Sequence, residues 1–252
     1  MQTKVDLNSD MGEGFGRWSM GDDAALLNVV TSANIACGFH AGDPDVMAAT
    51  MRRAVDNGVG IGAHPGFGDL QGFGRRRMSL SHGELANMVT YQVGAARAMA
   101  ASVGGNVRHL KLHGALSNMA TEDAGMARAC FEAALRVQPD IMIMVLAATP
   151  MEAVVRDLDC NWAAEIFADR AYEDDASLLD RTKPGAVLHD ADAAATRILA
   201  MLDEGAIICA TGKRIPARID TICLHGDTAE AVEMAVALRK RLEGAGVTPT
   251  RL

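Results

Sequence analysis

The stretch Lys4-Val-Asp-Leu-Asn-Ser-Asp-Met-Gly-Glu13 shows the pattern that the rest of the chain repeats. A segment with the length of a strand runs into a loop that carries acidic side chains and glycine. Short apolar runs of this kind recur, and longer amphipathic segments lie between most of them. Strands that alternate with helices predict a parallel sheet and an α/β fold. The strand candidates are Lys4–Asn8, Ala33–Cys37, Gly60–Ala63, Val107–Leu112, Ile141–Leu146, Ala163–Phe167, Ala206–Cys209 and Thr221–Leu224.

The number of strand–helix units decides between a barrel and an open sheet. About seven units fit the length of the chain, too few for an undistorted eightfold barrel. We expect Ala206–Cys209 and Arg214–Ile219 to form a hairpin excursion instead. The sequence therefore predicts one α/β domain over residues 1–252, a distorted (β/α) TIM-like barrel of about seven strands. An open doubly wound sheet is the alternative.

Helix starts are marked by capping residues. Asp43 precedes a proline, and Asp190 and Asp227 precede helical patterns, so each is a candidate N-cap. Ser81 and Thr149 each have a glutamate three residues later, which is the spacing of a capping box.

Composition narrows the class of protein. Hydrophobic residues make up 49% of the 252 residues and charged residues 22%, as in ordinary globular proteins. The formal net charge of −8 disfavours general nucleic-acid binding, because phosphate repels an acidic surface. The longest apolar run, Ile141–Ala148, is shorter than the ~18 residues of a membrane span, and we expect no membrane partner. Residues 1–10 lack the apolar core of a signal peptide.

The five cysteines indicate the compartment. They contain no Cys-x-x-Cys pair and their number is odd, which disfavours a disulfide scaffold or a zinc knuckle. A reducing cytoplasm is the expected location.

Side chains that can do chemistry fall just after strands. The carboxyl ends of parallel strands meet at one face, which hosts the active sites of barrels and open sheets. Four of the seven histidines fall at such ends, whereas His82, His109 and His189 resemble helix-start or strand-start residues. The residues predicted at this face are Asp6, Asn8, Asp10, Glu13, Asn34, His40, Asp43, His64, Lys111, His113, Glu165, Asp169, Arg170, His225 and Asp227.

Several of these residues have a structural alternative. Asp43 and Asp227 could serve as caps alone, and acidic residues in a glycine-rich loop often only stabilise turns. Lys111 is expected to face inward, because an outward ammonium would lie against a helix. Arg75 and Arg76 belong either to a solvated run or to an anion-binding loop. Dispersed histidines and aspartates could hold a divalent metal, although the sequence lacks HxxxH and HExxH spacing.

Nucleotide-binding patterns are absent from the sequence. Gly205–Lys213 ends in Gly-Lys, but its spacing breaks the P-loop pattern, and Arg214 stands where Ser or Thr is needed. There is also no GxGxxG fingerprint and no GxSxG nucleophile elbow.

Eight blocks, in order and nearly end to end, closely resemble the LamB/YcsF family of bacterial lactam utilisation proteins, known as the A subunit of 5-oxoprolinase. The chain departs from the family's usual pattern at Ser9, Leu112 and Ser117, where the family commonly has Cys, Pro and Tyr. Ser9 excludes thiol chemistry at that position. The blocks are Asp6-Leu-Asn-Ser-Asp-Met-Gly-Glu13, Ser32-Ala-Asn-Ile-Ala-Cys-Gly-Phe-His-Ala-Gly-Asp43, Gly62-Ala-His-Pro65, Asp69-Leu-Gln-Gly-Phe-Gly-Arg-Arg76, His113-Gly-Ala115, Phe167-Ala-Asp-Arg-Ala-Tyr172, Lys183-Pro-Gly-Ala-Val-Leu-His-Asp190 and Cys223-Leu-His-Gly-Asp-Thr228.

The resemblance implies a fold similar to glycoside hydrolase/deacetylase barrels and an ATP-dependent opening of 5-oxo-L-proline to L-glutamate. The family's enzyme works with two further subunits, B and C, which implies that ATP is a co-substrate bound with or by these partners. Whether the chain also forms a homo-oligomer is left open by the sequence.

The implied reaction needs three kinds of group. A base for water is expected among Asp10, His40, His64 and His113, and Lys111 is expected to stabilise developing negative charge. Arg75, Arg76 or Arg170 could clamp a carboxylate or phosphate. The remaining residues of the predicted face are candidates for binding substrate.

Two other functions remain open from the sequence. The first is a metal-dependent deacetylase or amidohydrolase that acts alone on the same face. The second is a non-catalytic subunit that binds the lactam or stabilises its partners.

Overall fold

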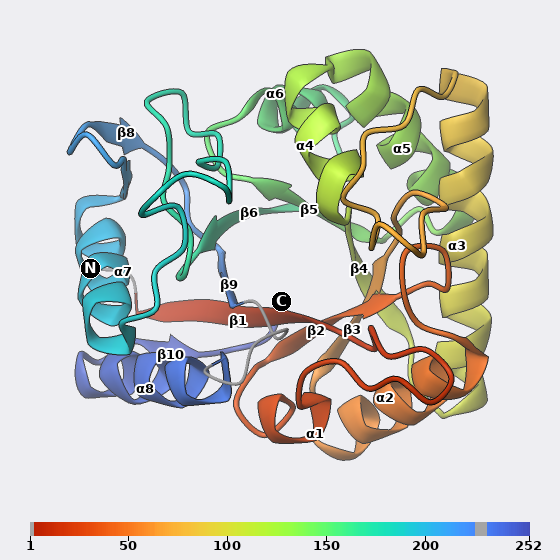
Figure 1. The fold of residues 1–252 in the computed structure, drawn as a ribbon, viewed down its shortest axis with the longest axis horizontal. Helices are drawn as coiled ribbons and strands as arrows, with labels where there is room; N and C mark the ends of the chain where they lie inside the picture. The colour runs from red at the N-terminus through yellow and green to blue at the C-terminus, as the bar shows by residue number, and fades with distance from the viewer. Residues whose placement is uncertain (1–2, 225–230) are drawn as a thin grey trace.

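A closed ring of seven parallel strands forms the centre of the molecule in the computed structural model, which describes residues 3–224 and 231–252 (Figure 1). The strands are β1 (Lys4–Met11), β2 (Ser32–Ala36), β3 (Gly60–His64), β4 (Val107–Lys111), β5 (Met142–Leu146), β6 (Trp162–Phe167) and β9 (Thr221–Leu224). Each strand of this series pairs in parallel with the next, and β9 closes the ring by pairing with β1 as well as β6. The predicted barrel is confirmed, and the open doubly wound sheet is wrong.

Helices cover the outside of this barrel. In Figure 1, α2 and α3 lie to the right of the strands, and α7 and α8 lie to the left. The helices are α1 (Asp23–Leu26), α2 (Pro44–Asp56), α3 (His82–Ser102), α4 (Gly114–Glu122), α5 (Ala124–Val137), α6 (Pro150–Asp157), α7 (Ala191–Glu204) and α8 (Ala231–Gly244). No helix in residues 3–224 and 231–252 is long and apolar enough to cross a membrane.

Among the named strands of the described residues, two short pairings lie outside the ring. The expected hairpin excursion is confirmed as an antiparallel pair, β7 (Ala206–Ile208) with β8 (Arg214–Pro216). A final strand, β10 (Thr248–Pro249), pairs with the first residues of β1. From Asp6 onward, β1 pairs with β9 instead. The chain end therefore covers the beginning of the first strand below the point where the ring closes.

The barrel strands are apolar on the outside, and most of them place polar side chains on the inside. Leu7, Ile35 and Leu110 are fully buried in the apolar layer of the core. Asp6 and Asn8, which flank Leu7, instead bond to side chains of other strands. Barrel interiors are more often filled by branched apolar side chains. Because buried polar groups are costly unless they are hydrogen-bonded, this interior must be internally paired.

The helix caps agree with the sequence except at Thr149. Ser81 and Glu84 form a complete capping box, and Asp43 and Asp190 cap α2 and α7. The capping box predicted at Thr149 is wrong, because its hydroxyl donates to the carbonyl of Leu146 and caps no helix amide. The predicted cap Asp227 lies outside the described residues.

Both carboxylate oxygens of Asp43 accept hydrogen bonds from backbone amides. Oδ1 accepts from Asp45 and Val46, and Oδ2 accepts from Gly16 at 2.7 Å. Hydrogen bonds from the amides of Val46, Gly16 and Asp45 lower the pKa of Asp43, although desolvation opposes the shift. This geometry supports the capping interpretation, and a role for Asp43 in binding substrate stays a prediction.

Replacing Asp43 by alanine should lower the free energy of unfolding by about 1 kcal/mol, the usual cost of a lost N-cap. Asp43→Asn is the matched control, because its amide oxygen can still accept from the first turn of α2. Urea denaturation of both variants measures the difference. Equal destabilisation by the two variants would contradict the cap.

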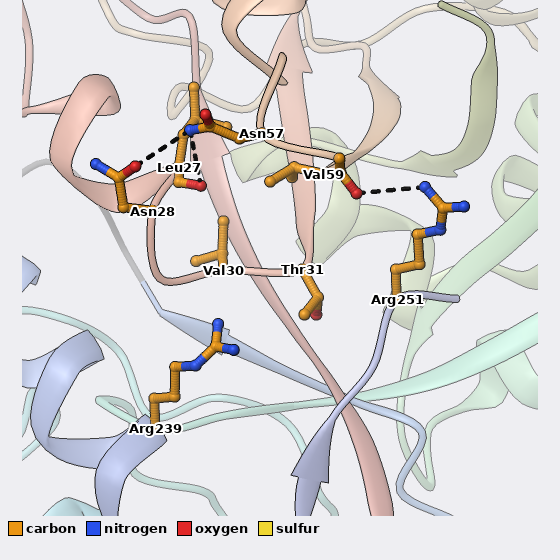
Figure 2. Close-up of a pocket in the computed structure, with 9 residues that line it drawn as sticks. Leu27, Asn28, Val30, Thr31, Asn57, Val59, Arg239 and Arg251 are labelled. Carbon is orange, nitrogen blue, oxygen red and sulfur yellow. Dashed lines mark hydrogen bonds between the residues drawn. The ribbon is translucent and has the colours of Figure 1, made fainter. Parts of the chain in front are cut away.

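A pocket of about 370 Å³ lies at the amino-terminal ends of the strands, away from the predicted site. Thr31 and Val59 line it just before β2 and β3 begin, and Arg239 and Arg251 reach it from α8 and the chain end (Figure 2). Both arginines donate to backbone carbonyls there. None of the predicted site residues within the described part of the chain lines this pocket, so we place the candidate site at the opposite end of the barrel.

Candidate active site

The lower part of the site is a hydrogen-bond network across the barrel interior. We call it the ladder (Asp6, Asn8, Ser32, Asn34, His109 and Thr221). Asn8 donates to the hydroxyl of Thr221 and accepts from Asn34, both at 2.7 Å. Below it, Asp6 accepts from the hydroxyls of Thr221 and Ser32. Burial raises the pKa of Asp6, although its hydrogen bonds oppose the shift. Asp6 and Asn8 thus tie strands together beneath the site, and their predicted contact with substrate stays a prediction.

His109 belongs to this ladder, and its interpretation as a strand-start or helix-start residue is wrong. Its Nε2 donates to Oδ1 of Asn34 at 2.8 Å inside the barrel. Burial, helped by the charge of Lys111, lowers the pKa of His109 to about 3, so the ring is neutral. The signal that identifies it is spacing: His109 and Lys111 are two residues apart in β4 and so face the same side.

Gly62 on β3 makes room for this ring. A Cβ at position 62 would overlap the imidazole of His109. We expect Gly62→Ala to lower the free energy of unfolding by about 1–3 kcal/mol, the usual cost of overpacking. Gly94→Ala is the control, because a Cβ at that position in α3 meets nothing within 4 Å. It should stabilise the protein by about 0.5–1 kcal/mol. Urea denaturation measures both changes, and a shift of the same sign in both would contradict the packing argument.

Above the ladder, the ammonium group of Lys111 lies among two carboxylates and a thiol. Its Nζ lies 3.0 Å from Oδ1 of Asp10, 2.8 Å from Oε1 of Glu165 and 3.0 Å from Sγ of Cys223. Burial lowers the pKa of Lys111, but the neighbouring Asp10, Cys223 and Glu165 more than offset this and hold it well above its ordinary value. Burial also raises the pKa of the Cys223 thiol. The inward orientation expected for Lys111 is confirmed, and its ammonium is charged.

Three histidines from different strand ends meet beside this lysine. His64 ends β3, and His40 and His113 follow β2 and β4. Nε2 of His64 lies 3.0 Å from Nδ1 of His113 and 3.4 Å from Oδ2 of Asp10. The rings of His40 and His113 stack with centroids 3.7 Å apart. Oε1 of Glu13 lies 3.8 Å from Nε2 of His40 and 3.8 Å from Nδ1 of His113.

These four side chains form a compact group, which we call the histidine cluster (Glu13, His40, His64 and His113). One potential ligand atom from each lies within 4.8 Å of all the others, and all four residues are buried. Burial lowers the pKa of His113 to about 3 and that of His40 well below its ordinary value, with neighbouring histidines adding to the shift. The convergence predicted for these strand ends is therefore confirmed for three of the four histidines. His225 lies outside the described residues.

The loop 69–76 holds the cluster in place. Nε2 of His113 donates to the carbonyl of Phe73 at 2.8 Å, and the ring of Phe73 packs edge-on against His40 and His113. Phe73 has a φ of 54°, which is strained for a residue with a Cβ. Gly74 follows at a φ of 62°, and a Cβ there would lie 2.6 Å from Cβ of His40. Such strain persists only where the surroundings fix it.

The two arginines predicted in this loop have different surroundings. Arg76 donates through Nε to both carboxylate oxygens of Asp69, at 2.9 and 3.0 Å. Arg75 is exposed, and its guanidinium lies over the ring of Phe73 at 4.8 Å from the centroid. Its positive charge contributes to the low pKa of His113 and His40. Arg75 is therefore the better placed of the two to meet a ligand at the cluster.

Arg170 lies apart, in the loop after β6. Its side chain donates to the carbonyls of Ala186 and Leu179, and burial lowers its pKa to about 10. Asp169 beside it is buried. Arg170 therefore braces the segment that leads to α7, and binding roles for Asp169 and Arg170 stay predictions.

Cys223, Thr221 and Ser32 also lie inside the site, although the sequence pattern does not single them out. Cys223 contacts Lys111, and the two hydroxyl residues bond to Asp6. They occupy alternate positions with other inward residues, Thr221 with Cys223 and Ser32 with Asn34. Once the inward face of one strand is known, period-two alternation identifies them.

Fold and site together define a (β/α) barrel with a charged, histidine-rich site at the carboxyl ends of its strands. The chain belongs to the LamB/YcsF family, whose model matches residues 5–252. It is 62% identical over 248 residues to a Ruegeria pomeroyi protein named as the A subunit of 5-oxoprolinase, with 98% of each chain covered. The family resemblance expected from the sequence is thereby confirmed.

Solved structures agree with this assignment. The crystal structure of a lactam utilization protein from Thermus thermophilus matches with a TM-score of 0.93 and 40% identity, covering 99% of this chain and 100% of that one. A family 4 carbohydrate esterase from Streptomyces lividans shares the fold alone, with a TM-score of 0.52 and 12% identity, covering 98% of this chain and 91% of that one. The expected similarity to deacetylase barrels is therefore confirmed at the level of fold.

Proposed function

We propose that the chain is the A subunit of an ATP-dependent 5-oxoprolinase and opens the lactam of 5-oxo-L-proline to L-glutamate in the cytoplasm. The names of the Ruegeria pomeroyi relative and of the Thermus thermophilus lactam utilization protein support this reaction class. The observation that carries the proposal is the pairing of Lys111 with Asp10 beside the histidine cluster. This places a fixed positive charge next to a carboxylate, as opening an amide requires.

The chemistry explains why ATP would be needed. An amide carbonyl is a poor electrophile, and transfer of the γ-phosphoryl group of ATP to the lactam oxygen would activate its carbon. Water then adds to that carbon, the ring C–N bond breaks, and the nitrogen leaves with a proton as an amine. A second water hydrolyses the resulting acyl phosphate to glutamate and phosphate. Since the sequence lacks a P-loop, we assign ATP binding to the partner subunits B and C or to their interface with this chain.

Three residues receive roles in this reaction. Asp10 takes the proton from the attacking water, because its Oδ2 faces the histidine cluster while its Oδ1 is held by Lys111 and Asn34. Lys111 stabilises the negative charge that develops on the substrate oxygen. Arg75, exposed beside the cluster, binds the substrate carboxylate.

The test is the release of glutamate and ADP from 5-oxo-L-proline and ATP, by this chain alone and with subunits B and C. We expect both products in a one-to-one ratio and only in the mixture. No turnover in a mixture whose B and C subunits work with another A subunit would contradict the substrate assignment. Glutamate released by this chain without ATP would favour the amidohydrolase alternative, which the histidine cluster also suits.

A further inference from the structure

Two ring nitrogens of the histidine cluster, Nε2 of His64 and Nδ1 of His113, face each other. Nδ1 of His64 lies 2.8 Å from the carbonyl of Lys111, which can only accept, so this nitrogen carries the ring proton. By the same argument, Nε2 of His113 carries the proton that it donates to Phe73. In the neutral rings, Nε2 of His64 and Nδ1 of His113 therefore both present lone pairs, at a separation of 3.0 Å.

Two carboxylates add to this concentration of lone pairs. Oδ2 of Asp10 lies 3.4 Å from Nε2 of His64, and Oε1 of Glu13 lies 3.8 Å from Nδ1 of His113. Carboxylate oxygens and unprotonated imidazole nitrogens are all acceptors, and acceptors brought this close repel one another. The ammonium of Lys111 is directed to the other oxygen of Asp10 and to Glu165. A cation placed among these atoms would remove the repulsion.

His40 provides a second, independent observation. Its side chain is completely buried, and among the described residues neither ring nitrogen has a hydrogen-bond partner. A buried polar group without a partner costs about 1–3 kcal/mol. Nε2 of His40 lies 3.8 Å from Oε1 of Glu13, within the same group of atoms. A ligand bound at the cluster would satisfy this nitrogen.

We propose that the histidine cluster binds one divalent transition-metal ion, with Glu13, His40, His64 and His113 as its ligands. Three imidazoles and one carboxylate suit Zn²⁺ best among such ions. Two nitrogens bound to one tetrahedral Zn²⁺ at ~2.0–2.1 Å lie ~3.3 Å apart, close to the 3.0 Å observed between His64 and His113.

The surroundings of the rings agree with this assignment. Histidines that bind metals usually donate their other ring N–H to a carboxylate, a backbone carbonyl or water, which fixes the ring and its tautomer. His64 and His113 do so through the carbonyls of Lys111 and Phe73. The strained conformation of Phe73 thus has a role, because it presents the carbonyl that orients His113.

Metal content and Co²⁺ binding test the proposal without substrate, ATP or partner subunits, so failure here is distinguishable from failure of the proposed reaction. The full chain is stripped with a chelator, dialysed and titrated with Co²⁺, whose visible d–d bands report four-coordinate binding. Reconstitution with Zn²⁺ followed by elemental analysis gives the stoichiometry. We expect one ion per chain for both metals.

His40→Gln is the decisive variant, because it removes a ligand that makes no hydrogen bond within the described residues. We expect it to weaken Co²⁺ binding by more than about 100-fold, beyond the 10–100-fold cost of altering an outer-shell partner. His82→Gln is the matched control, since His82 is an exposed residue at the start of α3. It should bind one ion with unchanged affinity.

Folding of each variant is checked by circular dichroism. If His40→Gln does not fold, Glu13→Gln replaces it with the same expectation. A folded wild-type chain that binds no Co²⁺ would overturn the proposal. Co²⁺ binding with equal affinity in wild type and ligand variants would overturn it as well, because the ion would then lie elsewhere.

Discussion

Lys111→Met should lower the free energy of unfolding by about 3–5 kcal/mol, the usual result of removing one partner of a buried ion pair. The ammonium is the charge that balances Asp10 and Glu165 inside the barrel, at 3.0 and 2.8 Å. Methionine nearly matches the volume of lysine but leaves the buried carboxylate of Glu165 and the partly buried carboxylate of Asp10 without the charge between them. We also expect turnover by the assembled subunits to be lost, because the charge that stabilises the substrate oxygen is gone. Urea denaturation and glutamate release measure the two effects.

The double variant Lys111→Met/Glu165→Gln separates these two roles. Removing one carboxylate charge together with the lysine should recover part of the lost stability, since only the partly buried carboxylate of Asp10 remains beside the introduced methionine. Turnover should stay absent, because the recovered fold still lacks the positive charge. A double variant that is no more stable than Lys111→Met would contradict the charge balance inside the barrel. Activity in either variant would contradict the catalytic role of Lys111.

The barrel can be predicted from the sequence because its strands are short segments, either apolar or alternating between apolar and polar residues, that end at turn or cap signals. Lys4–Asn8, Gly60–Ala63 and Thr221–Leu224 are predicted as strands, and the structure has them with small changes at their ends. The excursion over β7 and β8 is also predicted, because it does not fit a strand–helix repeat. Parallel order then follows from the intervening helices, and with it the face on which the strand ends meet.

From the sequence, one can predict that the histidines of the cluster lie near one another, but not how they are oriented. His40, His64 and His113 follow consecutive barrel strands, so their convergence depends on topology alone. The tautomers of His64 and His113 depend on the carbonyls of Lys111 and Phe73, whose positions are set by loop conformations that periodicity does not encode. The opposing lone pairs, which carry the metal proposal, therefore appear only in three dimensions.

The two wrong predictions have local causes. His109 lies near the start of a strand, which suggests a structural residue, whereas the alternation set by Lys111 turns it into the barrel. Thr149 and Glu152 have the spacing of a capping box, but the Thr149 hydroxyl finds a nearer acceptor in the carbonyl of Leu146. Glu152 accepts instead from the amide of Ala148, which has a φ of 58°. At this position the backbone conformation, rather than the spacing of Thr149 and Glu152, determines which groups these two side chains bond to.

Asp10→Asn should reduce kcat of the assembled subunits by about 10²–10⁴-fold, the usual contribution of a general base. Asparagine has the same shape but cannot take a proton from water. Its amide oxygen can still accept from Lys111 and Asn34, which contact Oδ1 of Asp10 at 3.0 and 2.9 Å. We therefore expect a smaller loss of stability than in Lys111→Met.

The effect of Asp10→Asn should fall on kcat rather than on KM or on the metal. KM should change little, since we assign the substrate carboxylate to Arg75, and Co²⁺ should still bind because Asp10 is not one of the four proposed ligands. Asp45→Asn, an exposed substitution in the first turn of α2, is the control and should leave kcat unchanged. Full activity in Asp10→Asn would contradict the role of Asp10 as the base. Loss of Co²⁺ binding would instead make Asp10 a ligand, and the water would then need another base. Steady-state kinetics and Co²⁺ titration on the same preparation therefore decide whether Asp10 takes a proton or holds an ion.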